Sequence, residues 1–232
     1  MALYNKGSGR SANRLADQRR FKINLILKGM IVVFGFFVIF VLSGGWKTGL
    51  FVIVPVGFIF IKLMKYFESE VRATRKREKH ALRGAKGEDN ISDILSNLSN
   101  DYLVLNDVET KQGDIDHVVI SKQGAVFVIE TKAHGGKVTF EGGKIFINGK
   151  NPEKNFIGQT LRNAYLIRDD IKELTGKIVW VNAILCFTNA FVDHHKAIRG
   201  VQVLNKKFLL RYIERNKPRY PVPEIWEKMK LR

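Results

Sequence analysis

The sequence predicts an α/β fold with a mixed central sheet, preceded by two apolar helices. Three observations lead to this prediction. Two runs without charged residues, 29–46 and 48–61, stand in the first third of the chain. From residue 101 onward, short runs rich in Val, Ile and Phe alternate with Gly, Asn and Asp, as strands and turns do. Two stretches, 87–98 and 155–174, have the composition and apolar spacing of helices.

Composition excludes several classes of protein. The 232 residues include 39 Lys and Arg against 22 Asp and Glu, which leaves a net charge of +17. Residues 1–83 hold 16 of these cations and only 4 acids, so most of the excess flanks the apolar runs. The near balance of residues 84–232 argues against a large non-specific DNA footprint. The single cysteine, Cys186, excludes an intramolecular disulfide and a multi-cysteine zinc site.

The two apolar runs predict a transmembrane hairpin at 29–65. The first run has about the length that crosses roughly 30 Å of hydrocarbon, and the second reaches it if Lys62 and Lys65 extend to the interface. Cations on both outer flanks place both termini, and the rest of the chain, on the cytoplasmic side of the plasma membrane. A signal peptide, a buried helical hairpin, and a single span with a re-entrant second segment remain as alternatives.

The apolar runs and the distribution of charge divide the chain into five parts. We expect a basic cytoplasmic N-terminal segment at 1–28, the hairpin at 29–65, a charged juxtamembrane linker at 66–83, a folded domain at 84–216 and a C-terminal tail at 217–232.

The elements of the folded domain follow in order. The helix at 87–98 has one apolar face, and the helix at 155–174 ends before Gly176. The nearly continuous apolar run at 177–187 is typical of a strand covered on both faces. Further strands are expected at 101–106, 114–120, 125–132, 137–140, 144–147 and 201–204, with a closing helix at 208–213.

The strands 114–120 and 125–132 hold a group of residues suited to phosphodiester chemistry. If residues 122–124 form a three-residue turn with Gly124 left-handed, Ser121 pairs with Ala125 and Asp116 falls opposite Glu130. Lys132 shares the face of Glu130 because side chains two apart in a strand point the same way. Two neighbouring carboxylates attract a hard divalent ion such as Mg²⁺ or Mn²⁺. A nearby lysine can orient a water molecule and offset charge on phosphorus.

Three runs of this sequence together resemble a known family. They are Gly84-Ala85-Lys86-Gly87-Glu88, Gly113-Asp114-Ile115-Asp116-His117-Val118-Val119-Ile120 and Gly124-Ala125-Val126-Phe127-Val128-Ile129-Glu130-Thr131-Lys132. In this order they are similar to the nuclease-related domain, NERD, of the PD-(D/E)xK nuclease-like superfamily. The resemblance covers about residues 84–190 and implies a restriction-endonuclease-like αβββαβ core.

The resemblance also implies roles for individual residues. Asp116 and Glu130 would be metal ligands and Lys132 the catalytic lysine. Glu88 would be an assisting carboxylate, and the Thr131 main-chain carbonyl a further ligand. The proline of the superfamily's name is absent, since Ile115 precedes Asp116.

Three further polar residues are candidate neighbours of the predicted site. Gln159 and Asn163 lie one turn apart on the long helix and are candidates for contact with the substrate backbone. His117 points to the face opposite Asp116, where a buried structural histidine is the more frequent case.

The sequence therefore supports a membrane-anchored, Mg²⁺- or Mn²⁺-dependent nuclease acting on DNA or RNA, with the lipid bilayer as a second partner. The alternative is a catalytically silent, membrane-anchored module that binds nucleic acid or protein through the same fold. In a third hypothesis the cationic flanks sense anionic lipids, which leaves the group of Asp116, Glu130 and Lys132 unexplained.

Overall fold

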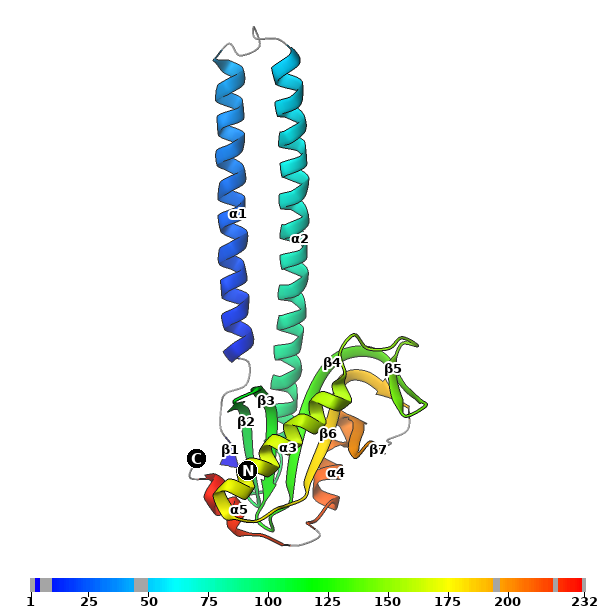
Figure 1. Cartoon of the computed structure of the whole chain (residues 1–232). Helices are drawn as coiled ribbons and strands as arrows, with labels where there is room; N and C mark the ends of the chain where they lie inside the picture. Colours follow the sequence, from blue (N-terminus) through cyan, green and yellow to red (C-terminus); the bar gives the residue numbers. More distant parts are fainter. Residues whose placement is uncertain (1–2, 5–9, 44–49, 194–196, 219–220, 231–232) are drawn as a thin grey trace. The chain divides into compact units, whose positions relative to one another are not determined.

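The structure, a computed structural model, describes residues 3–4, 10–43, 50–193, 197–218 and 221–230 (Figure 1). These residues form two units. One is helical and covers Ser11–Arg83; the other covers Gly84–Arg232 and includes the N-terminal strand β1, Leu3–Tyr4. The candidate site lies within the second unit.

The helical unit contains α1 (Arg10–Leu42) and the first part of α2 (Leu50–Leu95). The second apolar run from Leu50 onward, the charged stretch at 66–83 and most of the helix expected at 87–98 are therefore one continuous helix. The physical reason is composition, because the charged stretch is rich in Lys, Arg, Glu and Ala, which favour helix. Gly84 and Gly87 lie inside α2 without interrupting it.

The expectation of an integral membrane protein is wrong for the part of the chain that the structure describes. Neither α1 nor α2 contains a stretch both long and apolar enough to span a bilayer. The longest uncharged stretch of α1 is 29–42, about 21 Å of helix, and that of α2 is 50–61, about 18 Å, against roughly 30 Å of hydrocarbon. The predicted contact with a lipid bilayer depended on this transmembrane hairpin and is therefore not supported. Most of the turn expected between the two runs lies outside the described residues.

In the described residues, the second unit contains one mixed sheet of eight strands, in the order β1-β2-β3-β4-β6-β8-β7, with β5 paired to β4. The central strands β4 (Val126–Glu141), β6 (Val181–Val192) and β8 (Val201–Asn205) are parallel. β2 (Tyr102–Thr110) and β3 (Gly113–Ser121) extend the sheet, with β3 antiparallel both to β4 and to β2. This arrangement confirms the predicted mixed α/β fold.

Helices cover both faces of the sheet. On one face, α3 (Phe156–Thr175) and α5 (Glu224–Lys230) pack in a core that includes Val128, Ile167 and Trp226; α3 is seen in front of the sheet in Figure 1. On the other face, the end of α2 and α4 (Leu209–Arg215) pack with Phe127 and Ile184. β6 is thus covered on both sides, which explains its nearly continuous apolar sequence.

The register of the β3–β4 hairpin is the one that the turn predicts. The Ser121 N–H donates to the Ala125 carbonyl at 2.9 Å, and Gly124 is left-handed with φ 88°. The pairs His117 with Ile129 and Val118 with Val128 continue this register toward Asp116 and Glu130. A Cβ on Gly124 would lie 2.5 Å from the Val222 carbonyl oxygen, so only glycine fits this turn.

Other boundaries differ from those expected. The strands expected at 125–132 and 137–140 are one strand, β4, with an irregularity in its pairing to β6 between Lys132 and Gly135. β5 (Lys144–Ile147) pairs with the far end of β4 as expected. β6 begins at Val181, after residues 177–180, which form no strand. The short strand β7 (Ala197–Ile198) and the helix α5 were not foreseen, and α5 buries Ile225, Trp226 and Met229 in the core.

Candidate active site

The β3–β4 hairpin brings Asp116 next to the end of the buried part of β4. The main-chain N–H of Thr131 donates to Asp116 Oδ2 at 2.6 Å. The regular β3–β4 pairing ends at His117 with Ile129. The Thr131 N–H, two residues further along β4, is therefore available to a side chain of β3. The carboxylate of Asp116 is thereby held beside the segment Glu130–Lys132.

Glu130 lies deeper and has polar neighbours on two elements. Its side chain is buried, with 1% of the residue exposed, and forms an ion pair with Lys132 through Oε1. Asn163 on α3 donates to Glu130 Oε2 at 2.9 Å. The Lys132 ammonium lies 5.1 Å from the centre of the Phe156 ring, at the start of α3. These contacts fix the orientation of both charged groups.

Glu88 approaches the same place from α2. A Cβ on Gly87 would lie 3.0 Å from Ala133 Cβ and 3.6 Å from Thr188 Oγ1, so the missing side chain allows α2 to lie close to β4 and β6. Glu88, the next residue, is half-buried. The sequence run around Gly87 thus has a packing role that positions the carboxylate.

The acidic side chains act on one another electrostatically. Burial, with the charges of Glu130 and Glu88, raises the pKa of Asp116 well above its usual value, against the opposing effects of Lys132 and of the Thr131 N–H. Burial, followed by the charge of Asp107, raises the pKa of Glu88. The site is therefore a crowded group of carboxylates with one nearby ammonium, an arrangement that favours an added cation or proton.

The structure places the other predicted residues as follows. Asn163 reaches Glu130, whereas Gln159 lies half-buried one turn earlier on α3. The side chain of Thr131 is buried, and its Oγ1 has no hydrogen-bond partner among the described residues. The predicted roles of these residues in ligation and substrate contact stay predictions.

Three neighbours of the site were not foreseen. Phe156 is far from Lys132 in sequence, and no local pattern connects them. Asp107 has a positive φ of 48° and its charge acts on Glu88; the Asn106-Asp107 pair that interrupts the apolar residues of β2 was its signal. Asn106 belongs to a buried network, in which Ser92 donates to its Oδ1 at 3.2 Å and His117 Nδ1 lies 2.7 Å from the same oxygen.

The buried His117 gives the protein a predictable response to acid. Burial lowers the pKa of His117 to about 3, and its Nε2 is buried without a hydrogen-bond partner among the described residues. The unfolded chain takes up the proton near pH 6.5, so this contribution to stability is complete above pH 6.5 and is lost as the pH falls toward 3. We expect the free energy of unfolding to fall by about 1.4 kcal/mol per pH unit between roughly pH 6 and 4 from this group alone.

Urea unfolding at a series of pH values measures this slope. In His117→Gln, the slope of the free energy of unfolding against pH should decrease by the equivalent of about one proton. His80→Gln, at an exposed position, should leave this slope unchanged. An equal slope in wild type and His117→Gln would contradict a neutral buried histidine.

The carboxylates suit a hard divalent ion. Asp116 and Glu130 offer anionic oxygens, and their mutual repulsion, which adds to burial in raising the pKa of Asp116, would be relieved by a cation. Among the described residues, no three Asp, Glu, His or Cys side chains lie close enough together to form a metal site by themselves. An ion would therefore need main-chain, water or substrate oxygens as well, which is the usual coordination of Mg²⁺ at phosphate-transfer sites.

One comparison with known proteins covers the segment that contains this site. Residues 83–188 match the family model of the nuclease-related domain, NERD. No curated protein sequence matches the chain. Among solved structures, the crystal structure of a repair endonuclease from Pyrococcus abyssi is similar, with 16% sequence identity and a TM-score of 0.24. That alignment covers 56% of this chain and 42% of the other.

The match with the nuclease-related domain includes the β3–β4 hairpin and the end of α2, where Asp116, Glu130, Lys132 and Glu88 lie. It confirms the resemblance noted in the sequence for this segment. Residues 83–188, a little under half of the chain, are therefore similar to the nuclease-related domains.

Proposed function

We propose that this protein hydrolyses phosphodiester bonds of DNA or RNA with the help of Mg²⁺ or Mn²⁺. The observation that supports the proposal most is the group of Asp116, Glu130 and Lys132, gathered by one hairpin at the end of the buried part of β4. The match of this segment with the nuclease-related domain points to the same chemistry.

In this proposal, Asp116, Glu130 and the Thr131 carbonyl hold the ion. Bound there, the ion would polarise the phosphodiester and lower the pKa of a bound water. The chain itself orients the ligands. The Thr131 N–H holds Asp116, and Asn163 holds Glu130, so neither carboxylate has to be reoriented before substrate arrives.

Lys132 has the second role. Its ammonium can leave Glu130 Oε1 and donate to the attacking water or to an oxygen on phosphorus, where negative charge develops. The Phe156 ring beneath it keeps the ammonium close to the site during this exchange. Glu88, whose pKa is raised by burial, is placed beside these groups to accept or hold a proton.

A second function is favoured by one observation. Both Glu130 oxygens already have partners on this chain, Lys132 and Asn163, which is also what a catalytically silent module would show. Such a protein would use the same fold to bind nucleic acid or another protein without cleavage. Metal binding and cleavage separate the two functions.

The test uses the full chain with labelled single-stranded and duplex DNA and RNA. We expect cleavage that requires Mg²⁺ or Mn²⁺ and stops on addition of EDTA. Calorimetric titration of the protein with Mn²⁺ should give a binding isotherm without nucleic acid. A protein that neither cleaves any of these substrates nor binds Mn²⁺ would contradict the proposal and favour the silent module.

A further inference from the structure

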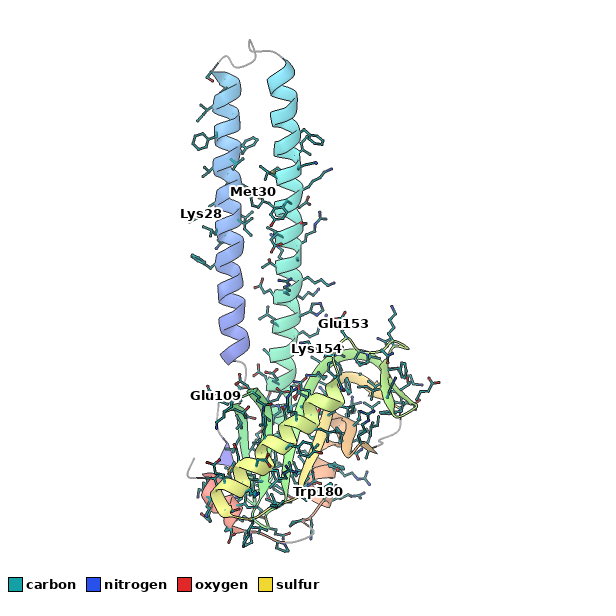
Figure 2. The ribbon with its side chains drawn as sticks, in the orientation of Figure 1. Lys28, Met30, Glu109, Glu153, Lys154 and Trp180 are labelled. Atoms are coloured by element: carbon teal, nitrogen blue, oxygen red, sulfur yellow. The ribbon has the colours of Figure 1, made fainter. Side chains whose placement is uncertain are left out.

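An exposed apolar surface lies outside the candidate active site, just before β6. Ile178 and Trp180 are 71% and 73% exposed, although they flank the buried Val179. Trp180 is labelled in Figure 2 at the end of the sheet where β6 starts, far from Lys154, which precedes α3. Large apolar side chains exposed next to each other usually mark a binding surface.

These side chains border a pocket with cations on its rim. The pocket has a volume of about 610 Å³, and its lining includes Trp180, Arg168 and Lys217. The Arg168 guanidinium lies 4.8 Å from the centre of the Tyr165 ring and 2.9 Å from Asp169, and its side chain remains 39% exposed. Tyr165 is itself 52% exposed. The pocket lining therefore combines the Trp180 indole, the Arg168 guanidinium and an exposed lysine, and the Tyr165 ring lies against the guanidinium.

The pocket connects to the candidate active site along β6 and α3. Val181 pairs with Val126 and Leu185 with Glu130, so Trp180 precedes the level of Glu130 by five residues of β6, about 17 Å. On α3, Asn163 contacts Glu130, while Tyr165 and Arg168 follow within the next two turns toward the pocket. A single nucleic-acid strand can thus run along α3 from the candidate active site to Trp180.

The chemistry of this surface fits a single strand better than a duplex. Exposed aromatic and guanidinium planes stack on unpaired bases, and cations near them hold the phosphates. In a duplex the faces of the bases are stacked on one another and inaccessible to Trp180. The few cations and the nearby Asp169 argue against binding through charge alone.

We propose that the pocket around Trp180, which Arg168, Ile178 and Lys217 also line, is a stacking subsite for a single-stranded segment of nucleic acid, with Tyr165 beside Arg168. The inference rests on the proposed function, because it treats this strand as the substrate entering the candidate active site. It specifies the substrate class as single-stranded DNA or RNA, or a single-stranded extension of a duplex. Stacking is indifferent to base identity, so the subsite holds the strand without choosing its sequence.

The test measures binding apart from cleavage. The full chain is titrated with a fluorescein-labelled deoxythymidine oligonucleotide of about 15 nucleotides in EDTA, followed by anisotropy. Trp180→Ala should weaken binding about 10-fold or more, since one base loses its stacking partner, and Trp180→Phe should recover most of the affinity. Lys217→Ala should reduce the slope of log affinity against log salt by about one. Phe191→Ala, at another aromatic that is 65% exposed, is the matched control and should bind as wild type does.

The outcomes separate this inference from the proposed function. Trp180-dependent binding without metal-dependent cleavage would sustain the subsite and overturn the nuclease. Cleavage by wild type with equal affinity and KM for Trp180→Ala would overturn the subsite alone. Trp180→Ala that changes the sedimentation coefficient but not the affinity would also overturn it, because the surface would then be an interface between copies of this chain.

Discussion

Glu130→Gln should reduce metal-dependent cleavage by on the order of 10³-fold while the protein keeps its fold. Glutamine has the shape of glutamate and can still accept from Asn163, but it has no charge with which to bind a divalent ion. The cleavage rate is measured with saturating Mn²⁺, and circular dichroism of the variant checks the fold.

The matched control for this variant is Glu173→Gln, an exposed glutamate on α3 outside the site, which should cleave like wild type. Calorimetry should show that Mn²⁺ affinity falls in Glu130→Gln and is unchanged in Glu173→Gln. Cleavage by Glu130→Gln within a few fold of the wild-type rate would exclude Glu130 as a metal ligand.

Lys132→Met should have two effects, one on stability and one on cleavage. The ion pair with Glu130 is largely buried, with side-chain exposures of 17% and 2%. Removing the ammonium leaves a buried carboxylate that still accepts from Asn163 but has lost its cation, which should lower the free energy of unfolding by roughly 3 kcal/mol. Cleavage should fall by about 10²–10³-fold if the lysine stabilises charge on phosphorus, while Mn²⁺ still binds.

The double variant Lys132→Met/Glu130→Gln distinguishes the loss of a charge partner from the loss of packing. It should recover most of the stability, because no uncompensated charge stays buried, yet it should remain inactive. Lys122→Met removes an exposed ion pair with Asp101 and should leave the urea midpoint unchanged. A double variant as unstable as Lys132→Met would mean that Lys132 acts through packing on Phe156 rather than through Glu130.

Local sequence rules predicted the structure correctly where turn geometry and the two-residue period of a strand determine it. Gly124 sets a three-residue turn, and a strand period of two then places Asp116 near Glu130 and puts Lys132 on the face of Glu130. The long apolar run of β6 likewise predicted a strand covered on both faces, because apolar residues at successive positions can be buried only between two layers.

Local rules failed where charged and apolar runs are embedded in longer elements. A charged stretch favours helix as much as a linker, so α2 continues from Leu50 to Leu95. The lengths of the apolar runs included residues beyond the ends of the described helices, which made the segments look long enough to span a bilayer. Helix boundaries depend on packing and capping at both ends, and hydropathy alone does not define them.

By itself, the sequence of this protein determined the order of most elements, the register of one hairpin and the proximity of Asp116, Glu130 and Lys132 on that hairpin. Only the tertiary structure decided which distant side chains complete the site. Asn163 reaches Glu130, and Phe156 lies beneath Lys132, because α3 packs across the sheet. The missing side chain of Gly87 lets α2 bring Glu88 close, and the pocket beside Trp180 forms where α3, β6 and the C-terminal segment meet. The physical reason is the distance along the sequence over which each interaction acts. Turn geometry and strand alternation act between neighbours in sequence, whereas burial and side-chain pairing are fixed only when separate elements pack together.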